Sequence, residues 1–142
     1  MLQQSEPISL HDGIVVGTAD APELVGSRCR RCGVIAFPPQ ASCAACTSSD
    51  VEERRLARRG TLWTWTIQCF APKSPPYVGS AEDFAPYGVG YVELPGEVRV
   101  EARLTEADPR RLRIGMPMEL VLVAAPGPDG AMTYAFRPVE AQ

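Results

Sequence analysis

The sequence contains one histidine, His11, and lacks the long apolar runs that mark several protein classes. A lone histidine supports neither a catalytic triad nor a histidine metal site, so we interpret His11 as a surface residue. No stretch approaches the roughly 20 apolar residues of a membrane span, and no basic head followed by an apolar run marks a secretory signal. A phosphate-binding glycine loop and a nucleophile beside a base are also missing, which disfavours an enzyme.

An excess of basic residues is missing too. The chain has 14 Lys and Arg against 17 Asp and Glu, which gives a net charge of −3. A general binder of nucleic-acid backbones carries a basic excess. The length of 142 residues and a hydrophobic fraction of 45% suit one compact domain or a small module on a slightly larger one. Paired cysteines with a lone Cys69 fit a reducing compartment, so we expect a cytoplasmic protein.

Cysteine is the residue type that the sequence does place with a clear pattern. Two Cys-x-x-Cys pairs lie close together in the chain and consist of Cys29, Cys32, Cys43 and Cys46. Each pair directs two thiolates at one spot, and two pairs complete the tetrahedral sulfur set that structural zinc prefers. Because all four ligands come from the protein, no position stays open for a substrate. The pattern predicts one structural zinc ion per chain.

The residues between the cysteines favour the same interpretation. Gly33 follows Cys32, where a tight turn brings backbone amides near the sulfurs. Pro38 and Pro39 stiffen the hairpin that returns the second pair to the first. A redox dithiol or a pair of disulfides is the alternative, but a redox motif needs one pair rather than two. A rubredoxin-like iron site uses the same four ligands and stays open.

We expect a mainly β protein in three parts. Residues 1–26 form an N-terminal arm, residues 27–50 a rubredoxin-like zinc ribbon, and residues 51–142 a β domain. The charged segment 51–59 at the start of the last part reads as a solvated connecting strand. From Gly60 the hydrophobic pattern has a period of two, which indicates half-buried strands.

The β domain is expected to contain five strands, at 60–69, 88–94, 97–104, 118–125 and 132–137. Pro95-Gly96 predicts a hairpin turn between the second and third strands. Asp108-Pro109 is a helix start signal, so segment 105–113 is a candidate for one short helical turn. Five strands with a short helix after the third are the layout of a five-stranded OB-fold barrel. An open five-stranded sandwich would read almost the same.

The first strand of this domain carries both tryptophans. Alternation places Trp63, Trp65, Ile67 and Cys69 on one face, which we expect to be the buried one. Cys69 is then a small buried hydrophobe rather than a catalytic thiol, because no histidine is available to activate it.

Segment 71–87 separates the first two strands and is long for a connection without structure of its own. It contains four prolines, and the aromatic residues Tyr77, Phe84 and Tyr87 lie among them. Proline lowers the entropy cost of ordering, and exposed aromatics favour a partner. We interpret the segment as a docking or substrate-covering loop whose three aromatic residues bind a partner. A mobile linker is the alternative.

The order of these motifs resembles the zinc-ribbon/OB-fold proteins known as domain of unknown function 35, the acyl-CoA-associated family. The resemblance covers about residues 22–138. Its carriers are Cys29-Arg30-Arg31-Cys32-Gly33, Phe37-Pro38-Pro39, Cys43-Ala44-Ala45-Cys46, Gly60-Thr61-Leu62, Phe84-Ala85-Pro86-Tyr87, Gly90-Tyr91-Val92-Glu93-Leu94, Leu112-Arg113-Ile114-Gly115-Met116 and Phe136-Arg137-Pro138.

The resemblance implies a noncatalytic accessory subunit that pairs with a thiolase-like acyl-CoA enzyme. Such partners include the lipid-transfer-protein type thiolases and the aldolases of steroid side-chain degradation. The subunit would stabilise the partner in a hetero-oligomer and help bind the CoA thioester. Arg28, Arg30 and Arg31 flank the first cysteine pair and are candidate CoA-binding residues, because arginine forks suit phosphates.

Two other functions are weighed against this one. Zinc ribbons and OB-folds also bind nucleic acids, and Trp63 and Trp65 would be available to stack bases. Several arginines would line the groove: 28, 30, 31, 54, 55, 58 and 59. The negative net charge and the expected burial of both tryptophans argue against that function. An independent CoA-ester hydrolase or carrier is a third possibility, which nothing in the sequence requires.

Overall fold

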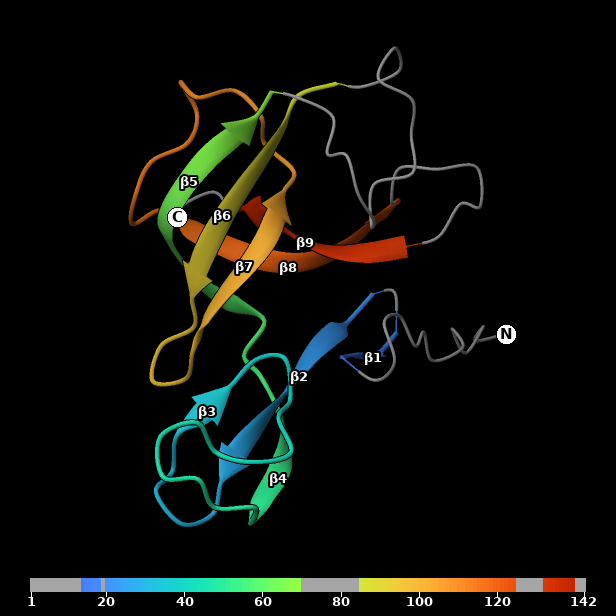
Figure 1. The fold of residues 1–142 in the computed structure, drawn as a ribbon. Helices are drawn as coiled ribbons and strands as arrows, with labels where there is room; N and C mark the ends of the chain where they lie inside the picture. The colour runs from blue at the N-terminus through green and yellow to red at the C-terminus, as the bar shows by residue number, and fades with distance from the viewer. Residues whose placement is uncertain (1–13, 19, 70–84, 125–131, 140–142) are drawn as a thin grey trace, which may run out of the picture.

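The structure, a computed structural model, describes residues 14–18, 20–69, 85–124 and 132–139. Within these residues the protein is built of nine strands and contains no helix. Figure 1 shows the strands in two groups, a small sheet near the N-terminal end and a barrel made by the rest of the chain. In the part of the chain that is described, no helix is long and apolar enough to cross a membrane.

The small sheet is organised around β2 (Pro22–Cys29), and its other strands are β1 (Val15–Gly17), β3 (Ile35–Ala36) and β4 (Val51–Arg55). The first residues of β2 pair with β1, and its later residues pair with β3 and β4. All these pairings are antiparallel. The charged strand expected in segment 51–59 is therefore β4, which belongs to the sheet of the zinc ribbon.

The barrel consists of β5 (Arg59–Gln68), β6 (Tyr87–Glu93), β7 (Arg99–Leu104), β8 (Pro117–Ala124) and β9 (Met132–Pro138). Its strand order is β5-β6-β7-β9-β8, and β5 pairs with β8 to close it. The pairing of β7 with β9 is parallel, and the remaining pairings are antiparallel. This closure confirms the five-stranded barrel and sets aside the open sandwich.

The sequence placed the turn between β6 and β7 correctly but was wrong about a helical turn after β7. At the first site the Leu94 amide donates to the Val98 carbonyl at 2.9 Å, and Gly96 has a φ of 71°. At the second site the chain forms a simple turn, in which Asp108 Oδ1 accepts the Arg110 amide at 2.9 Å. The Arg111 amide also donates to the Asp108 carbonyl at 2.9 Å, which closes a single turn, and Leu112 then enters the core instead of extending that turn into a helix.

The ribbon and the barrel share one hydrophobic core. Val15, Leu24 and Leu56, which come from the ribbon sheet and the segment after it, pack in the same buried cluster as barrel residues such as Phe136. Phe37 and Tyr134 also meet edge to face, with ring centroids 5.9 Å apart. The two parts therefore bury each other's apolar surface, and neither has a complete core alone.

A β-bulge in β5 overturns the expected burial of Trp63. Leu62 pairs with Val92 and Thr64 with Tyr91, which leaves Trp63 as the extra residue of the strand. Trp63 follows the buried Leu62, points outward and is 44% exposed, whereas Trp65, beyond the bulge, packs against the core. Strict alternation fails here because the inserted residue shifts the face of everything after it.

Cys69 is exposed, not buried as the alternation predicted. It follows the last paired residue of β5, Gln68, so it lies beyond the part of the strand that the barrel covers. Its thiol hydrogen-bonds the carbonyl of Ile67 at 3.6 Å. The prediction was wrong because the strand's inward face ends with Ile67.

Candidate metal centre

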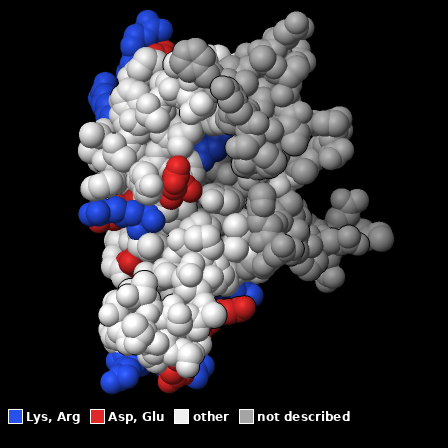
Figure 2. All heavy atoms as spheres, in the orientation of Figure 1, with Lys and Arg blue, Asp and Glu red and all other residues white. Residues whose placement is uncertain are grey.

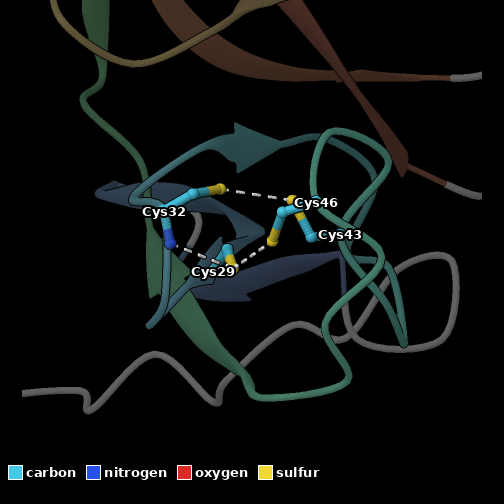
Figure 3. A group of neighbouring side chains, drawn as sticks. All are labelled: Cys29, Cys32, Cys43 and Cys46. Carbon is cyan, nitrogen blue, oxygen red and sulfur yellow. Dashed lines mark hydrogen bonds between the residues drawn. The ribbon is translucent and has the colours of Figure 1, made fainter.

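The four paired cysteines meet at the tip of the zinc ribbon. Cys29 is the last residue of β2, Cys32 lies in the turn that follows, and Cys43 and Cys46 come from the loop between β3 and β4. Their four sulfur atoms lie within 4.8 Å of one another. Figure 3 shows the side chains converging, and the sulfurs of Cys29 and Cys46, like those of Cys32 and Cys43, are 3.5 Å apart.

The backbone folds both cysteine pairs in the same way. The residue after each pair adopts a positive φ, which is 81° for Gly33 and 65° for Thr47. Its amide donates to the carbonyl of the first cysteine of its pair, at 2.9 Å in both knuckles. The turn expected at Gly33 is confirmed. The second knuckle uses Thr47, a β-branched residue for which this conformation is costly, and its hydroxyl donates to the Cys46 carbonyl at 2.6 Å.

The local hydrogen bonds lower the thiol pKa of two of the four cysteines, Cys29 and Cys43. The Cys32 amide donates to Cys29 Sγ at 3.4 Å, and chiefly this bond lowers the pKa of Cys29 to about 6. The pKa of Cys43 is lowered as well, mainly by the Cys46 amide. The Val34 amide lowers the pKa of Cys32. The neighbouring cysteine sulfurs, of which Cys43 has the largest effect, act in the opposite direction and, with burial, raise the pKa of Cys32 to about 12. A dication would replace the proton retained there.

The donor set fits a zinc ion. Four sulfurs at the usual Zn–S distance of about 2.3 Å lie roughly 3.8 Å apart at the corners of a tetrahedron, and the observed cluster is close to that size. The cysteines are free thiols, so the disulfide alternative does not fit. Cys29 and Cys43 are buried and Cys32 is exposed, which puts one edge of the centre at the surface. Zinc held here supplies a cross-link between two loops.

The structure gives two of the three candidate CoA-binding arginines carboxylate partners. Arg28 NH1 and Arg30 Nε each lie 3.3 Å from an oxygen of Glu52, and Arg30 also lies 3.5 Å from Asp50. Arg31 is exposed. A phosphate would compete with these carboxylates for Arg28 and Arg30. Sequence reasoning missed Glu52, although its pairing opposite Arg28 follows once β2 and β4 are aligned.

Three of the four remaining arginines of the expected nucleic-acid groove are also compensated, whereas Arg58 donates to the Asp20 carbonyl at 3.4 Å and has no carboxylate partner among the described residues. Three ion pairs link Arg54 to Glu97, Arg55 to Glu23 and Arg59 to Glu119. In Figure 2 basic and acidic side chains lie side by side at several places on the visible face. Ion pairing leaves little positive charge for a phosphate backbone. The exposure of Trp63, however, removes one argument that the sequence had offered against base stacking.

Two of the three expected partner-binding aromatics, Tyr77 and Phe84, lie outside the described residues. Tyr87 begins β6 and is half-buried. The guanidinium of Arg103 lies over its ring, 4.2 Å from the centroid. The structure therefore places Tyr87 on the outside of the barrel beside β7, where it is supported by a cation–π contact.

Two family models match this chain, one for each part of the fold. Residues 19–52 match the rubredoxin-like zinc ribbon domain of ChsH2, and residues 53–123 match the C-terminal OB-fold domain of ChsH2. The division between the models falls within β4. The zinc-ribbon match agrees with the four-sulfur geometry and favours zinc over iron.

Two curated relatives align over most of the chain. A DUF35 domain-containing scaffold protein of Methanocaldococcus jannaschii is 32% identical and aligns over 82% of each chain. The benzoylsuccinyl-CoA thiolase subunit BbsA of Thauera aromatica is also 32% identical, and the alignment covers 91% of this chain and 87% of BbsA.

A solved structure has the same arrangement. A chain of the Ltp2-ChsH2(DUF35) aldolase superposes with a TM-score of 0.62 at 28% sequence identity, covering 82% of this chain and 84% of that one. The likeness spans both the ribbon and the barrel. The proteins similar to this chain thus include a scaffold protein, a thiolase subunit and a chain of an aldolase complex.

Proposed function

This chain belongs to the DUF35 family, with the zinc ribbon and OB-fold of ChsH2, and from that premise we propose that it is a noncatalytic accessory subunit of a thiolase-like acyl-CoA enzyme. The observation that supports this most is the alignment over 91% of the chain with a protein named as a thiolase subunit. The chain's role would be to bind the catalytic subunit and stabilise it in a hetero-oligomer.

The chemistry of the described residues supports a noncatalytic role. The metal centre has four protein sulfurs and leaves no position for a substrate or for an activated water. The exposed thiol of Cys69 has no histidine among the described residues to activate it. Thioester and carbon–carbon bond chemistry would therefore reside in the partner.

The partner that we propose is a thiolase or retro-aldolase of the lipid-transfer-protein type, acting in steroid side-chain or other lipid degradation in the cytoplasm. One similar protein is named a benzoylsuccinyl-CoA thiolase subunit, which supports a partner that handles CoA thioesters, and another is named an Ltp2-ChsH2 aldolase, which supports a partner with aldolase activity. We further propose that Arg28, Arg30 and Arg31 meet the phosphates of CoA, and that the 71–87 loop, through Tyr77, Phe84 and Tyr87, contacts the partner and covers the acyl end.

Co-expression with the thiolase-like subunit of the source organism tests the assignment. We expect the two chains to elute together in gel filtration at micromolar concentration. The catalytic subunit alone should be insoluble or poorly active, and the isolated accessory chain should cleave neither thioesters nor carbon–carbon bonds. Separate elution together with full activity of the lone catalytic subunit would contradict the proposal. Tight binding of single-stranded DNA at physiological salt would favour a nucleic-acid module instead.

The same complex tests the contact with CoA. Replacing Arg30 and Arg31 by alanine should raise KM for an acyl-CoA more than KM for an acyl chain without the nucleotide. Arg110→Ala is the matched control, because this arginine side chain is 88% exposed and belongs to the turn after β7. If the double variant and the control have equal KM values for the acyl-CoA, CoA is bound entirely by the partner.

A further inference from the structure

An aromatic and cationic cluster lies on the outer surface of the barrel, and we call it the Trp63 patch. It consists of Trp63 from β5, Tyr91 from β6 and Arg99 from β7. The rings of Trp63 and Tyr91 meet edge to face with centroids 6.1 Å apart, and the Arg99 guanidinium lies 4.0 Å from the Trp63 centroid. Trp63 is 44% exposed and Tyr91 is 39% exposed. Figure 1 shows the three strands side by side in front of β8 and β9.

The backbone, rather than chance, presents this tryptophan to solvent. Trp63 follows the buried Leu62, so the alternation before the bulge turns Trp63 outward, and the extra residue of the bulge then turns Trp65 inward. Bulges are known to redirect side chains near functional sites. The neighbouring loop adds a second apolar side chain: Ile114, 71% exposed, precedes Gly115, whose amide donates to the Leu62 carbonyl at 2.7 Å.

The contacts around the patch hold its side chains in fixed positions. Arg99 stacks on Trp63 and lies 3.7 Å from Glu93 on the neighbouring strand. The Tyr91 hydroxyl hydrogen-bonds Glu101 at 3.3 Å. Side chains that are already ordered lose less entropy when a partner covers them. Tryptophan, tyrosine and arginine are also the residue types that dominate binding energy at protein interfaces.

Charge decides which kind of partner fits. Arg99 is the one cation in the patch, and the two carboxylates beside it, Glu93 and Glu101, give the area no positive excess. A nucleic-acid strand needs a row of cations along its phosphates, and this surface does not offer one. A protein surface suits the patch better. Its apolar groups would cover the two rings, and one carboxylate or carbonyl would pair with Arg99, whose side chain is 49% exposed.

The closed barrel also restricts how a protein can dock. The strand β6, which carries Tyr91, is paired along almost its whole length with β5 on one side and β7 on the other, so no strand can be added beside it. Docking at the patch therefore uses side chains on the outer face. The described residues include four large hydrophobic side chains that are exposed. Three of them, Trp63, Tyr91 and Ile114, belong to the patch or to the loop beside it.

We propose that the Trp63 patch is the surface through which this chain docks on its thiolase-like catalytic subunit. This inference rests on the proposed function and adds a location that the sequence did not predict. The expected interface has Trp63 at its centre, the ring being covered by the catalytic subunit on the side that Arg99 leaves open. The carboxylates 93 and 101 then lie at the rim, where charges contribute little to affinity.

The chain's two tryptophans give this proposal an internal control. Labelled with 5-fluorotryptophan, the chain shows one fluorine resonance for Trp63 and one for Trp65, which Trp65→Phe assigns. Adding the unlabelled catalytic subunit should shift the Trp63 resonance and remove its response to solvent deuteration. The Trp65 resonance should change little, because its side chain packs against the core.

Affinity supplies the second readout. Trp63→Ala should weaken the complex at least about thirtyfold, as expected of a hot spot, and Arg99→Ala should weaken it as well. Val34→Ala is the control, since Val34 is 45% exposed on the zinc ribbon, away from the patch. If Trp63→Ala binds with wild-type affinity, and the Trp63 resonance of the wild-type chain does not change on binding, the docking surface is overturned and the proposed function stands. If the wild-type chain does not bind the catalytic subunit at all, the proposed function fails first. A Trp63 response to oligothymidylate instead would overturn the inference in favour of nucleic acid.

Discussion

Glu119 on β8 is a single carboxylate that binds an arginine on each side. Its Oε2 accepts Arg59 Nε from β5 at 2.8 Å, and its Oε1 accepts Arg137 NH2 from β9 at 2.7 Å. The three residues lie opposite one another in the strand pairings. The hydrogen bond from Arg137, followed by that from Arg59, lowers the pKa of Glu119. Stability from this carboxylate is therefore present above its unfolded pKa and lost as pH falls through the lower folded pKa.

We expect Glu119→Gln to lower the free energy of unfolding by about 1 kcal/mol at neutral pH, because the exposed arginines limit what the pair contributes. Urea denaturation measures this difference in the free energy of unfolding. It should be carried out at neutral pH and again at a pH below the range in which the folded Glu119 carboxyl titrates. The difference from wild type should shrink at the acidic pH, where both proteins carry a neutral side chain. Glu53→Gln, on an exposed residue of β4, should leave stability unchanged at both pH values. A pH-independent difference would contradict the linkage.

Single residues also mark where the sequence was a poor guide. The cysteine pattern predicted the metal cluster because four ligands at fixed spacing leave little freedom. The position of Trp63 was not predictable, since nothing in the run from Thr61 to Thr66 marks a bulge. The prediction for Cys69 was wrong for a simpler reason. Alternation shows which residues share a face of the strand, but it does not show where along the strand the barrel stops covering that face.

Among the elements, the hairpin between β6 and β7 is linked by hydrogen bonds to the zinc ribbon and to the segment that follows it. Glu97 in this hairpin accepts Arg54 Nε of β4 at 3.0 Å and the Ala57 amide at 2.8 Å. Its side chain is 8% exposed, so the carboxylate is shielded from water and both hydrogen bonds are needed. The contact fixes the direction in which the chain leaves the ribbon and enters β5.

Glu97→Ala should lower the free energy of unfolding by about 1–3 kcal/mol, because it leaves the Ala57 amide without its acceptor. Glu97→Gln keeps an acceptor and should cost less. A double-mutant cycle with Arg54→Ala, followed by urea denaturation, separates the ion pair from the backbone contact. Additive losses for the two residues would mean that the pairing with Arg54 contributes nothing.

The strands were the elements that sequence patterns predicted best. Alternation and the Pro95-Gly96 turn gave all five barrel strands within one or two residues of their positions. Cross-strand partners such as Glu97 and Arg54 were not predictable, because they depend on how the ribbon packs on the barrel rather than on local sequence. The absence of a helix after β7 has a similar cause: a start signal cannot show that the chain makes a single turn at Asp108 and then enters the core at Leu112.

At the scale of the whole molecule, the shared core makes the zinc ion a support for the barrel as well as for the ribbon. Leu24 and Val15 lie on the ribbon sheet yet pack with barrel residues. Zinc binding in small modules is worth roughly 10–16 kcal/mol at neutral pH, similar to the stability of a whole domain. Loss of the zinc ion should therefore disturb the packing around Trp65, because this side chain packs against the same core.

We expect elemental analysis to find one zinc per chain, and chelation to unfold ribbon and barrel in one transition. Far-UV circular dichroism and Trp65 fluorescence in a Trp63→Phe variant should change together as the chelator is titrated. Cys43→Ala should reproduce the metal-free behaviour, and Cys69→Ala should not. A barrel that keeps its Trp65 signal after zinc has left would show that the two parts are independent.

The closure of the barrel by its last strand has a consequence for how the protein emerges from the ribosome. The cysteine cluster is complete once Cys46 and β4 are made, because all its contacts lie close together in the chain. The barrel must wait for β9, whose Phe136 pairs with Leu104 of β7 and Leu120 of β8. During synthesis the apolar residues of the ribbon therefore stay uncovered until β9 is made. Slow translation of the segment that encodes β8 and β9 would expose that surface to chaperones and proteases.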